Sequence, residues 1–126
     1  MMTVSGTRGK RGEDAVAEFL IAAGHTVLDR NWRSGHLELD LVSIDKSGLH
    51  FVEVKTRRLS AGENAAPQES VGTVKQRRLV EAAKRYLAKK DGRIGDVEVF
   101  FDVAAVIDNG GSLDITYYPD DFLPIG

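Results

Sequence analysis

Residues 51–55 read "FVEVK", and this stretch decides the fold. It continues an apolar alternation that starts at Leu49, which predicts a β-strand with one buried face. Side chains alternate along a strand, so Phe51, Glu53 and Lys55 share a face. An acid and a base therefore lie on the face that Phe51 directs toward the core, and that arrangement needs a chemical explanation.

The preceding segment, residues 37–44, also reads as a strand, and the turn residues "DKSG" at 45–48 predict a hairpin between the two. Facing residues of an antiparallel pair are related by a constant register. With a two-residue turn at the tip of the hairpin, that register places Asp40 opposite Glu53.

The same register places Glu38 opposite Lys55, so three carboxylates and one lysine are expected to converge. Directly opposed Cβ atoms lie about 4.5–5.5 Å apart. Two carboxylates at this distance repel unless one is protonated, a cation joins them, or each is neutralised separately. A divalent cation with oxygen ligands accounts for the pattern, with the lysine beside it. The alternative is a buried ion-pair network, which stabilises a fold less well than apolar packing.

The whole chain predicts an α/β domain with a mixed sheet flanked by helices, in the order αβββαββ. We interpret residues 1–126 as a single domain in which residues 1–8 are flexible and residues 56–72 form a mobile loop. The expected helices cover residues 12–23 and 73–87. The expected strands cover residues 26–30, 37–44, 49–55, 96–107 and 113–118.

Glu13 opens the first expected helix and lies within about 60° of the centre of its apolar stripe, at 100° per residue. A carboxylate on the core side of a helix needs a partner, which makes Glu13 a candidate member of the same acidic cluster. The alternative is an acid of the first helical turn that the helix dipole stabilises.

Composition excludes several classes of protein. The chain has no cysteine, so disulfides, thiolate nucleophiles and cysteine-rich zinc sites are excluded. The opening residues hold no apolar run typical of a secretory leader, and the given sequence has no apolar run of membrane-spanning length, so we expect a cytoplasmic protein without a membrane partner. The net charge of −2 conceals segregation, because residues 53–93 hold eleven basic and five acidic side chains. A basic middle segment is typical of polyanion binding, and equally of a solvated helix face.

These residues resemble the PD-(D/E)XK nuclease core, particularly the archaeal Holliday-junction resolvase branch, and more closely the YraN family of small bacterial proteins. Leu37 stands where that family usually has glycine. The matching features run through most of the chain: Gly9, Gly12-Glu13, Ala17, "LDRNWR" at 28–33, "ELDLV" at 38–42, "FVEVKTR" at 51–57, Lys75, Ala82, "YL" at 86–87 and "FDV" at 101–103.

The resemblance implies a restriction-endonuclease-like fold and a metal site. Asp40 and Glu53, with the carbonyl of Val54, would hold Mg²⁺ or Mn²⁺, and Glu13 or Glu38 would be an outer ligand. The implied catalytic residues are Glu13, Asp40, Glu53 and Lys55. The implied nucleic-acid contacts are Arg57, Arg58, Lys75, Gln76, Arg77 and Arg78.

The resulting hypothesis is a metal-dependent DNA endonuclease that acts on branched or damaged DNA. The alternative is a non-catalytic nucleic-acid-binding or scaffold protein that retains the fold. Monomer and homodimer both stay open.

Three further interpretations concern single residues outside this cluster. The histidines lack metal-ligand spacing, and we interpret His50 as facing solvent. Trp32 is expected to cap the sheet, or to stack on a base. Asp102, in an apolar strand, is expected to be a structural hydrogen-bond acceptor.

Overall fold

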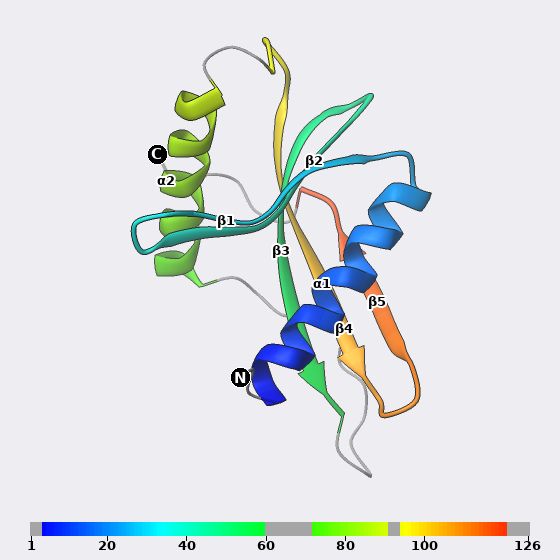
Figure 1. Cartoon of the computed structure of the whole chain (residues 1–126). Coiled ribbons are helices and arrows are strands. Elements are labelled where there is room, and N and C mark those ends of the chain that lie inside the picture. The colour runs from blue at the N-terminus through cyan, green and yellow to red at the C-terminus, as the bar shows by residue number, and fades with distance from the viewer. Residues whose placement is uncertain (1–3, 60–71, 91–93, 121–126) are drawn as a thin grey trace.

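The computed structural model describes residues 4–59, 72–90 and 94–120, with backbone only for 4–8. Two helices and five strands occur in the order αβββαββ, so the expected order and the mixed α/β class are confirmed (Figure 1). The elements are α1 (Val4–Ala22), β1 (Thr26–Ser34), β2 (Leu37–Asp45), β3 (Gly48–Arg58), α2 (Thr73–Lys90), β4 (Val99–Asp108) and β5 (Leu113–Tyr118).

The five strands form one sheet in the order β1-β2-β3-β4-β5. Neighbouring strands are antiparallel except β3 and β4, which are parallel and are joined through α2. In the β2–β3 hairpin, Asp45 pairs with Gly48 and Leu41 with Val52, as the two-residue turn predicts. The expected register is therefore confirmed.

The sheet separates two apolar cores, one under each helix. Val16 and Leu20 of α1 pack with Leu41 and Val52 on one face. The α2 residues join the core on the other face together with Phe51. Figure 1 shows the two helices on either side of the sheet. Within the described ranges, neither helix combines the length and apolarity that a membrane span requires.

Several element boundaries differ from expectation. Helix α1 begins at Val4, so residues 4–8 are helical where flexibility was expected. Strand β3 continues to Arg58, which corrects the predicted loop at residues 56–58. Residues 60–71 of that loop lie outside the described residues. Strand β4 begins at Val99, three residues later than expected.

Gly12 permits helix α1 to lie directly against β3. A Cβ atom at Gly12 would lie 2.1 Å from Oγ1 of Thr56 and 3.3 Å from its Cβ. The 2.1 Å separation is sterically forbidden and the 3.3 Å one is tight, and Thr56 is β-branched and has little rotamer freedom. The close approach brings the next residue of the helix, Glu13, toward the strand that carries Glu53.

Gly12→Ala is expected to lower the free energy of unfolding by about 1–3 kcal/mol, because the added methyl group overpacks the α1–β3 contact. Gly9→Ala is the matched control: it lies in the same helix, and a Cβ there meets no atom within 4 Å. It should stabilise the protein by about 0.5–1 kcal/mol through helix propensity alone. Urea denaturation of both variants and of Gly12→Ala/Thr56→Ala measures the contact. A Gly12→Ala variant as stable as Gly9→Ala would contradict it.

Candidate functional site

The sheet forks at Asp40. The β2–β3 pairing ends at Leu41 and Val52, whereas β2 stays paired with β1 as far as Leu37. Beyond this point β3 pairs only with β4 (Figure 1). The core contacts of β2 also change at this point. Leu39 packs on the α2 side of the sheet, whereas Leu41 packs on the α1 side.

The side chain of Asp40 bridges this fork. Its Oδ2 accepts a hydrogen bond from the backbone N–H of Val54 at 2.9 Å, where a paired strand would otherwise supply a carbonyl. In a β-strand the N–H and C=O of one residue point to the same side. The Val54 carbonyl oxygen therefore faces the same opening as its N–H.

Asp40 and Glu53 meet at the fork, as the register predicts, because Glu53 acts on the carboxyl group of Asp40. Glu53 is only 6% exposed. Burial, followed by the charge and hydrogen bond of Glu53, raises the pKa of Asp40 to about 8, although the Val54 N–H opposes this rise. Two carboxyl groups thus occupy a site that favours a proton or a cation between them, or a separate partner for each.

Glu13 extends the acidic cluster from helix α1. Burial raises the pKa of its carboxyl group and the negative charge of Asp40 raises it further, while a hydrogen bond from Asn31 lowers it. Asn31 has a positive φ of 50°, a conformation that asparagine tolerates better than most residues. Sequence reasoning gave Asn31 no role, because the expected strand ended at Arg30, whereas β1 continues to Ser34.

Glu38 does not face Lys55, so that expectation is wrong. The strands have already separated at this position, and Glu38 Oε2 instead lies 3.1 Å from Nη2 of Arg33 across the β1–β2 pair. Lys55 lies beyond the fork on β3 and is half-buried. By strand alternation it shares a side of β3 with Glu53 and Arg57.

Lys75 joins the site from the first turn of α2. Its Nζ lies 3.3 Å from Oε1 of Glu53, although more than half of its side chain is exposed. Gln76, one residue later, is half-buried, and its backbone N–H donates to the carbonyl of Gly72 at 2.9 Å. The first helical hydrogen bond therefore begins one residue before Thr73.

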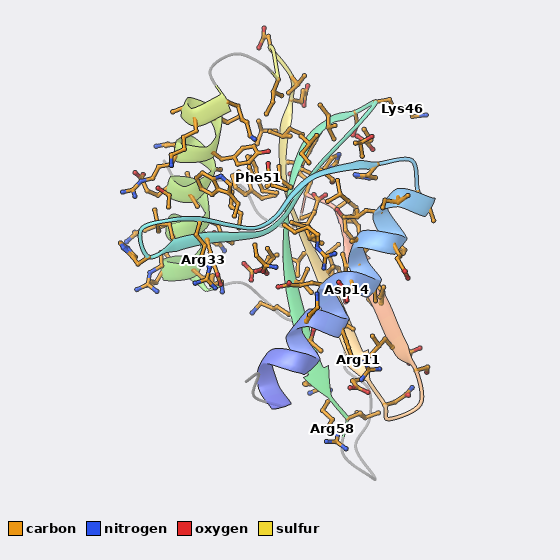
Figure 2. All side chains as sticks on the ribbon, in the orientation of Figure 1. Arg11, Asp14, Arg33, Lys46, Phe51 and Arg58 are labelled. Atoms are coloured by element: carbon orange, nitrogen blue, oxygen red, sulfur yellow. The ribbon has the colours of Figure 1, made fainter. Side chains whose placement is uncertain are left out.

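The other predicted nucleic-acid contacts are dispersed. Arg57 is half-buried, and its Nε and Nη2 atoms have no hydrogen-bond partner in the described part of the chain. Arg58 is exposed at the end of β3, near Arg11 in Figure 2. Arg77 and Arg78 are exposed on α2. They border a groove of about 280 Å³ lined by His36, Leu37, Val74, Arg77, Arg78, Glu81 and Arg85.

A second polar cluster lies at the turn of the β2–β3 hairpin. His50 is 7% exposed, so the expected solvent-facing position is wrong. Its Nδ1 lies 2.7 Å from Oδ2 of Asp102, and Asp102 also accepts hydrogen bonds from the Tyr117 hydroxyl and the Asp120 N–H. The structural acceptor role of Asp102 is thereby confirmed.

Trp32 packs edge-to-face on Tyr86 of α2, with ring centroids 5.3 Å apart. It lies half-buried against the α2-side core. The described contacts thus match the expected cap on the sheet.

A family model described as "Uncharacterised protein family UPF0102" matches residues 12–106. The chain belongs to the UPF0102 family. UPF0102 is the YraN family, so the resemblance to that family is confirmed. One UPF0102 protein, from Syntrophotalea carbinolica, is 44% identical over 115 residues, which cover 90% of this chain and 89% of the relative. Another, from Bacteroides thetaiotaomicron, is 41% identical over 116 residues and 92% of each chain.

Among solved structures, "The structure of Pyrococcus Furiosus SfsA in complex with Ca2+" is similar at 20% identity, with a TM-score of 0.41. The similarity covers 90% of this chain and 62% of that one. The UPF0102 match includes Glu13, Asp40 and Glu53 of the acidic cluster and His50 and Asp102 of the second polar cluster.

Asp40→Asn is expected to stabilise the metal-free protein increasingly as pH rises. The unfolded carboxyl group ionises near pH 4, and the folded one near pH 8. Between these values the folded state binds more protons, so the stability of the unsubstituted protein falls as pH rises. Denaturant melts in EDTA at pH 5 and pH 9 should show a relative gain of at least about 1.4 kcal/mol for the variant, which corresponds to one pKa unit.

Asp14→Asn provides the control for this measurement. A hydrogen bond from Arg30 lowers the pKa of Asp14, so its linkage has the opposite sign and no gain is expected at high pH. An Asp40→Asn variant that loses stability between pH 5 and pH 9 relative to the unsubstituted protein would show that the two carboxyl groups do not repel.

Proposed function

We propose that the protein is a metal-dependent DNA phosphodiesterase that acts on branched or damaged DNA. One observation carries the proposal: the carboxyl groups of Asp40 and Glu53 converge and interact at the fork in the sheet. Buried carboxyl groups that face one another weaken a fold. Their presence therefore favours a functional role for the site. The resemblance to PD-(D/E)XK nucleases supplies the reaction class.

The oxygen atoms at the fork suit a hard divalent cation such as Mg²⁺ or Mn²⁺. The proposed ligands are Asp40, Glu53 and the carbonyl of Val54, all of which face the opening between β2 and β3. Glu13 would be an outer ligand, since its carboxyl group senses the charge of Asp40. A bound cation would lower the pKa of a coordinated water and offset negative charge on the phosphate.

The basic side chains around the acids have separate proposed roles. Lys55, on the same side of β3 as Glu53, would orient the attacking water and stabilise the negative charge that develops on the phosphorus oxygens. Arg57 would contact a neighbouring phosphate only after a change of rotamer, because the two guanidinium nitrogens that have no partner in the described residues are buried. Lys75 would release Glu53 and contact the DNA backbone.

The surface that extends from this site along α2 would bind DNA. Arg77 and Arg78 border the groove beside the β1–β2 hairpin, and Arg33 lies on that hairpin (Figure 2). Together with Arg58 and Gln76, these side chains would contact the phosphate backbone, which determines position and affinity rather than sequence. Homodimer formation and the cytoplasmic location stay predictions.

The second candidate is a nucleic-acid-binding or scaffold protein without catalysis. It is favoured by the 3.3 Å ion pair between Lys75 and Glu53, because an ammonium group already offsets one carboxylate charge. In that case Asp40 would keep its proton and no cation would be needed.

The catalytic proposal predicts different defects for acids and lysine. Asp40→Asn and Glu53→Gln should lose Mn²⁺ binding and DNA cleavage together, because each removes an anionic ligand. Lys55→Ala should keep Mn²⁺ and DNA binding but lose at least about 100-fold in kcat, because its interaction develops in the transition state. Lys46→Ala, at the hairpin tip in Figure 2, is the matched control and should cleave normally.

Calorimetric titration with MnCl₂ and single-turnover assays on linear, flapped and four-way DNA make these measurements. The scaffold candidate predicts no cleavage of any substrate and melting temperatures that Mn²⁺ leaves unchanged. That pair of results would reject the phosphodiesterase and retain the scaffold.

DNA affinity is expected to fall when the groove loses its positive charge. Arg77→Glu/Arg78→Glu should weaken binding at least tenfold at low salt and reduce the slope of log Kd against log salt, because fewer counterions are released. Lys46→Glu/Lys84→Glu reverses two exposed lysines outside the groove and should have a smaller effect. Fluorescence anisotropy at several salt concentrations provides the test. Equal losses in both variants would place the DNA elsewhere.

A further inference from the structure

Two histidines and an aspartate converge at the opposite end of the β2–β3 hairpin from the fork. His25 follows α1, Asp45 ends β2 and His50 lies in β3. One ligand atom from each lies within 4.8 Å of the other two. Asp45 Oδ2 is 3.3 Å from His25 Nε2, and Asp45 Oδ1 is 2.9 Å from His50 Nε2. The side chains are only 9% (His25), 19% (Asp45) and 9% (His50) exposed.

Hydrogen bonds from the other ring nitrogens hold both imidazoles in place. Nδ1 of His50 lies 2.7 Å from Oδ2 of Asp102, and Nδ1 of His25 lies 2.9 Å from Oγ of Ser43. With the proton on each Nδ1, both Nε2 lone pairs point toward Asp45. Histidine ligands of metals are generally oriented by such a bond to a carboxylate or another acceptor.

We propose that His25 Nε2, His50 Nε2 and Asp45 bind one Zn²⁺ ion and thereby tie the end of α1 to the hairpin. Ligand atoms that lie about 2.0–2.1 Å from a tetrahedral zinc are about 3.3 Å from each other. The two nitrogen–oxygen separations of 3.3 and 2.9 Å lie near this value but involve different oxygens of Asp45. The three ligand atoms lie within 4.8 Å of one another, so binding one ion requires a small rotation of these side chains. Ser47, whose Oγ lies 3.1 Å from His50 Nε2, or a water would adjoin the fourth position.

Charge and ligand type both favour this ion. Asp45 and Asp102 contribute two negative charges at the cluster, which Zn²⁺ balances while both imidazoles stay neutral. Imidazole nitrogen is a preferred ligand of zinc, whereas Mg²⁺ prefers oxygen. This site is therefore chemically distinct from the all-oxygen site at Asp40, and it does not depend on the proposed nuclease activity.

Zinc binding can be measured on the untagged full chain after EDTA treatment and dialysis. The Asp40→Asn/Glu53→Gln background removes the acidic site, so that added ZnCl₂ reports the histidine cluster alone. At free Zn²⁺ a hundredfold above Kd, the melting temperature should rise by roughly 5–10 °C. His25→Gln should weaken Zn²⁺ binding at least tenfold and abolish this rise.

His36→Gln is the matched control, because His36 is exposed and lies outside the cluster. It should bind Zn²⁺ as the background protein does. A second measurement needs no histidine variant: Co²⁺ added to the same chain should produce visible d–d absorption typical of low coordination number, and ZnCl₂ should remove it. Absence of both the melting shift and the absorption, or equal zinc binding by His25→Gln and His36→Gln, would overturn the proposal.

Discussion

The hydrogen bond from the Val54 N–H to the Asp40 carboxylate holds the fork of the sheet together. It lies where β2 stops pairing with β3, so a side chain replaces the backbone acceptor that the departing strand no longer supplies. The bond keeps one carboxylate against the β3 backbone and brings it into reach of Glu53. The β1–β2 hairpin can then extend across α2 while β3 continues beside β4 (Figure 1). The acidic site is thus a consequence of how the sheet divides.

One hairpin carries two polar sites of different chemistry at its two ends. The fork collects carboxylate and carbonyl oxygens, which suit hard cations, whereas the turn collects two imidazoles around one carboxylate, which suit zinc. The intervening pairs, Leu41–Val52 and Val42–Phe51, form a regular ladder with apolar cores on both faces. This rigid ladder keeps each set of ligands oriented independently of the other.

Local rules are sufficient to predict the register of that hairpin and the meeting of Asp40 with Glu53. A two-residue turn and side-chain alternation involve neighbours in sequence, and they are enforced by the apolar residues that must face the core. The same rules predict both helices, because apolar residues recur at helical spacing, and most of them are buried, among them Val16, Leu20, Leu79 and Tyr86, although Phe19 and Leu87 are exposed. These features depend little on distant parts of the chain.

The fork and the histidine cluster required the tertiary structure. The alternation rule pairs Glu38 with Lys55, but the β2–β3 pairing ends at Leu41 and Val52, and Glu38 forms an ion pair with Arg33 instead. Glycine is required at position 12 because of Thr56, which lies 44 residues away in the sequence. The histidine cluster combines residues of four separate segments: His25, Asp45, His50 and Asp102. Contacts of this kind arise only when helix α1 and strand β4 pack on the hairpin, because no local periodicity encodes which distant side chains will meet.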